Sequence, residues 1–100
     1  MTAYRLVADP RVDLDVAATH QWYENERAGL GLEFLHELGA AYDRIADDPF
    51  TYQDVEAGIR RALLRRFPYA VYFSVENDIV VILAALHVSR DPAEWQRRRV

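Results

Sequence analysis

Apolar residues recur at helical spacing in two segments of the first half of the chain. The first segment runs from about Asp13 to Glu26, and the second from about Leu32 to Ala46. The apolar stripe of the second segment consists of Phe34, Leu35, Leu38, Ala41, Tyr42 and Ile45. Glycines at positions 29 and 31 interrupt the period between the two segments. So short a connection predicts that the two helices form an antiparallel hairpin.

Shorter apolar runs, rich in β-branched and aromatic residues, replace the helical period in the second half. They predict three antiparallel strands, at Ile59 to Arg65, Tyr69 to Val75 and Ile79 to Leu86, with a turn at Asn77 and Asp78. The third strand is apolar on both faces, which indicates a central place in the sheet. The core is expected to pair one set of helix residues with one set of strand residues or their neighbours: Phe34, Leu38, Tyr42 and Ile45 with Val71, Phe73, Ile82 and Ala84.

The ends of the chain and one connection complete the order of elements. Tyr4 to Ala8 predicts a short N-terminal strand, Phe50 to Gly58 a loop, and Asp91 to Glu94 the start of a short C-terminal helix. The predicted fold class is therefore α+β, with an N-terminal strand, an antiparallel helical hairpin packed on a mainly antiparallel sheet, and a short C-terminal helix. Residues 1–100 are expected to form one domain.

Charge is distributed unevenly along the chain. Residues 1–58 carry four Arg against twelve Asp and Glu, whereas residues 59–100 carry eight Arg against four acids. Two interpretations stay open: the C-terminal part faces an anionic partner, or the two parts neutralise each other inside the fold. All twelve basic residues are arginine, whose planar guanidinium suits forked contacts to carboxylate or phosphate.

Composition argues against several classes of protein. The chain has no cysteine, so disulfides and thiolate zinc sites are excluded. His20 and His36 have no second metal ligand at a useful spacing, and we expect neither a metal nor another cofactor. The N-terminus lacks the pattern of a signal peptide, and the longest apolar run, Ile79 to Leu86, is too short to span a bilayer. A cytoplasmic protein without a membrane partner is expected.

Three groups of segments follow one another from about Val12 to Arg98. The first group is Trp22-Tyr23-Glu24, Gly29-Leu30-Gly31, Phe34-Leu35 and Ile45 to Pro49. The second group is Gly58 to Arg61 followed by Arg66 to Tyr72. The third is Ile82 to Pro92 with Trp95. In this order the three groups resemble toxins of the RelE/ParE superfamily. The resemblance rests on the order of these segments and on the length of the chain, because each piece alone is ordinary helix or strand.

The resemblance implies the toxin of a bacterial type II toxin–antitoxin pair, harmless while a cognate antitoxin holds it in a hetero-oligomeric complex. RelE-like members are ribosome-dependent endoribonucleases that cleave translated mRNA. ParE-like members inhibit DNA gyrase, and no hydrolytic chemistry is attributed to them. RelE-like members resemble one another in basic residues on the central strands, an arginine near the end of the last strand, and a C-terminal tyrosine. The fold does not decide between the two activities.

Candidate site residues follow from matching these features by type and region. In a RelE-like enzyme the catalytic residues would be His87, Arg90, Arg60 and Arg65. The residues expected to bind a target or the antitoxin are Arg60, Arg61, Arg65, Arg66, Arg90, Trp95, Trp22 and Tyr23. Trp95 stands near the place of the RelE-like tyrosine, and an indole, which only donates a hydrogen bond, has no useful proton to exchange. This departure, together with the segment Leu86 to Asp91, favours the ParE-like side, with mRNA cleavage as the other possibility.

Each candidate also has a purely structural interpretation. The four arginines between positions 60 and 66 occupy both faces of one predicted strand, so they cannot all line one site. His87 fits a hydrogen bond at a strand end, and Arg90 fits a local ion pair with Asp91. Trp95 fits a lid packed on the core. These interpretations stand beside the functional ones until the structure places the side chains.

Overall fold

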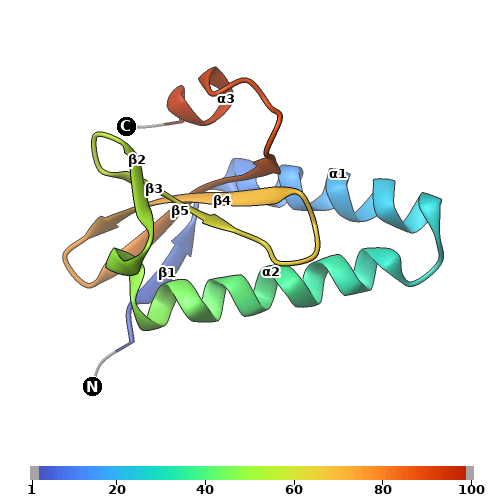
Figure 1. Ribbon diagram of the computed structural model, residues 1–100, viewed down its shortest axis with the longest axis horizontal. Helices are drawn as coiled ribbons and strands as arrows, with labels where there is room; N and C mark the ends of the chain where they lie inside the picture. The colour runs from blue at the N-terminus through green and yellow to red at the C-terminus, as the bar shows by residue number, and fades with distance from the viewer. Residues whose placement is uncertain (1–2, 99–100) are drawn as a thin grey trace.

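The computed structural model describes residues 3–98 and contains an α+β fold in the predicted order of elements (Figure 1). The elements are β1 (Arg5–Ala8), α1 (Pro10–Glu26), α2 (Leu30–Asp47), the 3-10 turn η1 (Pro49–Thr51), β2 (Gln53–Glu56), β3 (Ile59–Leu63), β4 (Tyr69–Glu76), β5 (Ile79–His87) and α3 (Ala93–Gln96). No helix within residues 3–98 is long and apolar enough to cross a membrane. The predicted fold class is confirmed.

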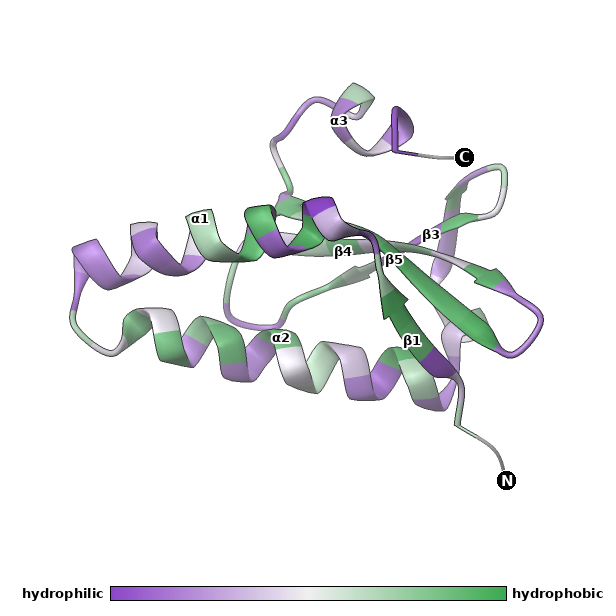
Figure 2. Cartoon of the chain, turned by 180° about the vertical axis from the view of Figure 1, so that it is seen from behind, coloured by the Kyte–Doolittle hydropathy of each residue, from purple (hydrophilic) through white to green (hydrophobic). Residues whose placement is uncertain are grey.

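The five strands form one sheet in the order β1-β5-β4-β3-β2. β1 pairs with β5 in parallel, and the other three pairings are antiparallel, so the sheet is mixed but mainly antiparallel. β5 lies inside the sheet, as predicted, and hydropathy colouring shows it apolar along its length (Figure 2). α2 of the helical hairpin lies on one side of the sheet, and α3 lies on the other side (Figures 1 and 2).

Both helices begin earlier than the apolar period indicates, because caps define their first turns. α1 begins at Pro10: the carboxylate of Asp9 accepts a hydrogen bond from the backbone N–H of Arg11 at 2.9 Å, and proline suits the first helical position. α2 begins at Leu30, directly after Gly29 in a left-handed conformation with φ 89°. Glu24 of α1 accepts the N–H groups of Gly29 at 2.9 Å and Gly31 at 3.1 Å. The second helix is therefore capped by a side chain from the first.

The prediction of a loop from Phe50 to Gly58 is wrong, because β2 lies within it. β2 is a four-residue edge strand in which only the side chain of Val55 is partly buried. Short edge strands with charged residues carry no apolar alternation to reveal them. β3 also ends at Leu63 rather than Arg65, so Arg65 and Arg66 belong to the following loop.

The core between the hairpin and the sheet contains the predicted residues with two exceptions. Buried helix and strand residues meet there as expected, namely Phe34, Leu38, Ile45, Val71, Phe73 and Ile82. Tyr42 is only partly buried, and burial together with the nearby Asp13 and Asp15 raises its pKa to about 12. Ala84 faces the other side of the sheet.

A bulge in β5 explains the position of Ala84. Tyr72 pairs with Ala84 but the next residue, Phe73, pairs with Ile82, so Leu83 is an extra residue in β5. Leu83 and Ala84 consequently both join the second core, on the face that α3 covers. That second core also contains Ile59, Tyr72, Leu86 and Trp95.

Candidate functional site

Two neighbouring depressions lie where α1 passes the C-terminal end of β5. One, of about 180 Å³, is lined by residues that include Leu14, Ala18 and Arg90, and the other, of about 400 Å³, by residues that include Trp22. Tyr69 and His87 line both. We call this area the α1–β5 surface and define it by Leu14, Ala18, Trp22, Tyr69, His87 and Arg90.

Exposed apolar side chains give the α1–β5 surface its character. Leu14 is 71% exposed and Trp22 is 57% exposed, and with Ala18 between them they form a stripe at four-residue spacing along α1. Val88, 45% exposed, follows directly after β5. Large apolar side chains that are exposed next to one another mark interaction sites in many soluble proteins.

An aromatic cluster supports this surface from below. The ring centroid of Tyr23 lies 5.8 Å from the centroid of Phe34, 4.9 Å from that of Phe67 and 5.9 Å from that of Tyr69. Desolvation among these rings raises the pKa of the Tyr23 phenol. Trp22 meets the edge of the cluster at 5.1 Å from Tyr23. Such packing holds the exposed indole on a rigid base.

His87 is fixed by its neighbours at the end of β5. Its Nδ1 accepts a hydrogen bond from the backbone N–H of Ser89 at 3.0 Å, and the hydroxyl of Ser89 lies 2.8 Å from the same nitrogen. The imidazole also meets the ring of Tyr69 edge-on at 5.3 Å. An accepting Nδ1 leaves Nε2 as the protonated nitrogen of the neutral ring. The structural interpretation of His87, a hydrogen bond at a strand end, is thus present in the molecule.

Arg90 lies half exposed beside His87. Its side chain is 51% exposed and its nearest acid is Glu94, at 3.6 Å, rather than the Asp91 that the sequence suggested. Asp91 instead accepts the backbone N–H of Ala93 at 3.0 Å at the start of α3. Because an exposed ion pair of this length contributes little, the guanidinium of Arg90 can turn to an incoming carboxylate or phosphate.

Arg60 lies far from His87 and is engaged by its own neighbours. Its Nη1 donates to the carbonyl of Tyr52 at 2.6 Å, and its guanidinium lies 5.0 Å from the ring centre of Phe50. Arg60 pairs with Phe73, whereas His87 pairs with Tyr69. Those partners are four positions apart on β4, which corresponds to about 13 Å at roughly 3.3 Å per residue. Arg60 therefore holds the segment before β2 against β3.

The remaining arginines of the predicted group point in different directions. Arg61 pairs with Tyr72 and so lies on the sheet face opposite to Arg60. In the loop after β3, Arg65 is exposed, while Arg66 donates to Glu33 at 2.6 Å. Hydrogen bonds from Arg66, and then from Arg27 at 3.1 Å, lower the pKa of Glu33. Part of the charge asymmetry is thus neutralised inside the fold.

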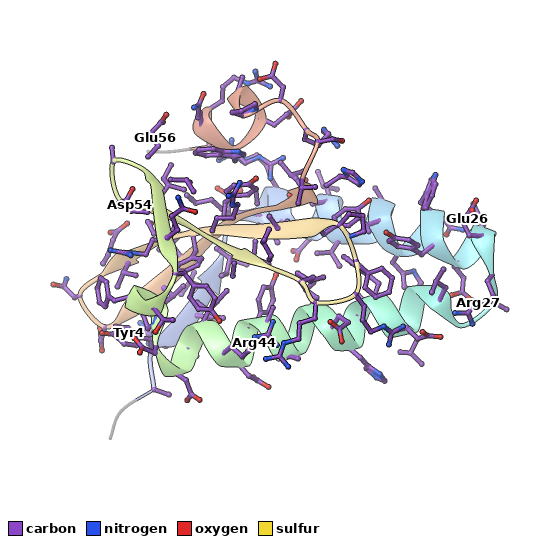
Figure 3. The ribbon with its side chains drawn as sticks, in the orientation of Figure 1. Tyr4, Glu26, Arg27, Arg44, Asp54 and Glu56 are labelled. Carbon is purple, nitrogen blue, oxygen red and sulfur yellow. The ribbon has the colours of Figure 1, made fainter. Side chains whose placement is uncertain are left out.

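Trp95 packs on the second core. Its indole stacks on Tyr72 with ring centroids 4.7 Å apart and an interplanar angle of 13°, and the residue is only 6% exposed. The next residue, Gln96, donates a hydrogen bond to the carboxylate of Glu56 at 2.8 Å. Figure 3 labels Glu56 on the β2–β3 side of the molecule. Of the predicted residues, the structure brings His87 and Arg90 together with Trp22, and separates Trp95 from them.

The sequence pattern gave no sign of an ion pair between Asp15 of α1 and Arg98. Asp15 receives both terminal nitrogens of Arg98, at 2.6 and 3.0 Å, and the backbone N–H of Ala85 at 3.1 Å. Arg98 also donates to the carbonyl of Leu83 in the β5 bulge at 3.2 Å. No spacing rule links residues 83 positions apart, and a bulge leaves no mark in the apolar pattern.

Comparison with known proteins identifies the fold. No protein-family model and no curated protein matches this chain. Among solved structures, a chain of the chromosomal ParDE TA system from P. aeruginosa superposes with a TM-score of 0.76 over 85% of this chain and 96% of that chain, at 16% sequence identity. At so low a sequence identity, the similarity supports a conclusion about the fold alone. The fold expected from the RelE/ParE resemblance is confirmed, and this chain has a ParE-like fold.

Proposed function

We propose that this chain is the toxin of a toxin–antitoxin pair and that it acts in the cytoplasm by binding DNA gyrase. A cognate antitoxin would neutralise it in a hetero-oligomeric complex. The observation that carries the proposal is the likeness, over nearly the whole of the other chain, to a chain of a ParDE TA system. We assign gyrase binding to the α1–β5 surface, because it combines an exposed apolar stripe with Arg90.

The geometry of the arginines supports binding over catalysis. Ribonuclease chemistry needs an acid, a base and positive charge gathered around one phosphate. Arg60 is turned to Tyr52 and pairs with Phe73 of β4, four positions from the partner of His87, while Trp95 is stacked on Tyr72. By contrast, tryptophan and arginine are among the residue types that dominate protein–protein binding energy, and Trp22 packs on the aromatic cluster through Tyr23.

The experiment compares two activities of the purified protein. Supercoiling by DNA gyrase and cleavage of mRNA on translating ribosomes are each measured with the parent chain and with three variants. Trp22→Ala and Arg90→Ala are expected to weaken gyrase inhibition by about 30-fold each, the size of a binding hot spot of about 2 kcal/mol. Arg5→Ala, an exposed arginine paired with the opposite end of β5, is the matched control and should behave as the parent.

The outcomes separate the two members of the superfamily. Gyrase inhibition that falls with the two surface variants and not with the control supports the proposal. Cleavage of mRNA without inhibition of supercoiling would contradict the proposal. It would indicate a RelE-type endoribonuclease, the other activity that the resemblance allows.

A further inference from the structure

A cavity of about 320 Å³ lies on the face of the sheet that carries α3. Its floor includes Ser74 of β4, which pairs with Val81 of β5 on one side and lies beside Ile59 of β3 on the other. Leu83, the extra residue of the β5 bulge, borders the cavity and belongs to the second core together with Trp95. Among residues 3–98, the lining includes no residue of the α1–β5 surface. The cavity is therefore a separate site.

The tight turn between β2 and β3 forms one wall of this cavity. Glu56 pairs with Ile59, so the turn consists of Ala57 and Gly58, whose φ angles are 42° and 94°. Both residues are left-handed, as a two-residue hairpin turn of type I′ requires. Glycine adopts this conformation freely, whereas alanine is strained in it. A strained residue in the wall of a cavity points to a ligand site, because such residues cluster where proteins bind ligands.

Two polar side chains of β4 face the cavity. Ser74 and Glu76 are two positions apart, so they lie on one face of the strand about 7 Å from each other. Neither side chain has a hydrogen-bond or ion-pair partner among residues 3–98. Arg5 lies in the same cross-strand row as Glu76, since both pair with Ile79, but two strand spacings, about 10 Å, separate them. Physiological salt, with a screening length of about 8 Å, weakens an interaction over that distance.

We propose that this cavity receives the side chain of a lysine from a partner protein. The aliphatic stem of the lysine lies on Ile59, Val81 and Leu83, because such stems cover apolar surface while the charged end stays in contact with water. The ammonium donates hydrogen bonds to the carboxylate of Glu76 and the hydroxyl of Ser74. This site goes beyond the proposed function, which uses the α1–β5 surface.

Three features select a lysine of another protein over other cations. The chain contains no lysine, so neither the chain itself nor a second copy supplies the occupant. Within residues 3–98, Glu76 is the one carboxylate of the lining, so the further ammonium groups of a free polyamine find no acid in the cavity. An arginine fork would take both oxygens of Glu76 in one plane, whereas the three donors of an ammonium diverge and reach Ser74 as well.

The test uses three capped amino acids and the purified full chain with isotope-labelled amides. The probes are Nα-acetyl-lysine N-methylamide, its Nε-acetylated form and Nα-acetyl-arginine N-methylamide. Titrations followed by NMR at the amide resonances of Ser74 and Val81 give a dissociation constant for each probe. We expect the lysine probe to bind about fivefold more tightly than either of the others, the upper end of what an exposed ion pair contributes.

Three variants locate the binding place. Glu76→Gln keeps the shape of the cavity and removes its charge, so the lysine probe and its acetylated form should bind equally. Ser74→Leu fills the cavity and should abolish the shift of the Val81 amide on addition of the lysine probe. Glu26→Gln is the matched control, because Glu26 is an exposed carboxylate that lines none of these depressions and lies at the other end of the molecule from Glu56 in Figure 3. Its binding should equal that of the parent chain.

Several results overturn the inference. They are no shift at the cavity with the lysine probe, equal binding of the lysine probe and its acetylated form to the parent chain, tighter binding of the arginine probe, and an undiminished preference in Glu76→Gln. Glu76→Gln changes one exposed side chain to its isostere, so it decides the matter even where Ser74→Leu fails to fold. The assay contains neither gyrase nor ribosomes, so its result is independent of the proposed function.

Discussion

Two glycines of α2 are expected to respond in opposite ways to the same substitution. A Cβ added at Gly31 would lie 2.7 Å from the ring of His20, 2.8 Å from the carbonyl oxygen of His20 and 2.9 Å from the carboxylate of Glu24. A Cβ added at Gly39 would meet nothing within 4 Å. Both positions are helical, so alanine gains helix propensity at each, but only Gly31 is in contact with α1.

The magnitudes follow from these distances. Gly39→Ala should raise the free energy of unfolding by about 0.5–1 kcal/mol, the ordinary gain in a helix interior. Gly31→Ala gains no more than that and forces a backbone carbonyl of α1 to move, an overpacking that typically costs about 1–3 kcal/mol. We expect Gly31→Ala to be less stable than Gly39→Ala by about 2 kcal/mol. In a domain of this size that difference corresponds to roughly 8–16 °C in Tm.

Urea unfolding followed by circular dichroism measures both variants against the parent chain. The helix content of the folded variants should match that of the parent, so a difference in midpoint reports on packing between the helices. Equal stabilisation by the two substitutions would refute the reasoning, because it would mean that α1 and α2 do not approach each other at Gly31.

Three further changes test other contacts. Leu38→Ala should lower the free energy of unfolding by about 2–5 kcal/mol in a urea titration, since Leu38 is only 5% exposed; a loss below 1 kcal/mol would place it outside the core. Hydrogen bonds from Arg11 lower the pKa of Asp9 from 3.8 to about 2. Asp9→Ala should therefore lower the free energy of unfolding by about 1 kcal/mol above pH 4, and the stabilities of variant and parent should converge as the pH falls toward 2. Asp15→Ala should cost about 3 kcal/mol and couple to Arg98→Ala by at least 1 kcal/mol, because their side chains are 9% and 11% exposed; additive effects would argue against the ion pair.

Periodicity predicted the parts of the fold that bury a continuous apolar stripe. The stripe of α2 and the two-sided apolar run of β5 are local features, and both appear in the structure where the sequence places them. β2 was missed because an edge strand with charged residues needs no apolar face. The bulge at Leu83 was missed because it arises from pairing with β4 rather than from the sequence of β5.

The candidate site was harder to predict than the fold. Arg60 and Arg61 look equivalent in the sequence, but adjacent strand residues face opposite sides of the sheet. Arg66 was expected on a strand and instead meets Glu33 from a loop. Such contacts join residues far apart in the chain, so composition and spacing could identify the residue types but not their partners.

Toxicity of two variants of neighbouring residues tests most directly whether the protein acts by binding. His87→Ala and Arg90→Ala are expressed at matched levels in bacterial cells that lack the antitoxin, with circular dichroism to confirm folding. We expect His87→Ala to lower toxicity less than tenfold and Arg90→Ala to lower it more, because an arginine at the end of β5 is the stronger anchor. General acid–base catalysis by His87 would instead contribute about 10²–10⁴ in rate. A folded but non-toxic His87→Ala variant, with cleaved mRNA in cells that express the parent chain, would instead mean that the protein is a ribonuclease and does not act by binding alone.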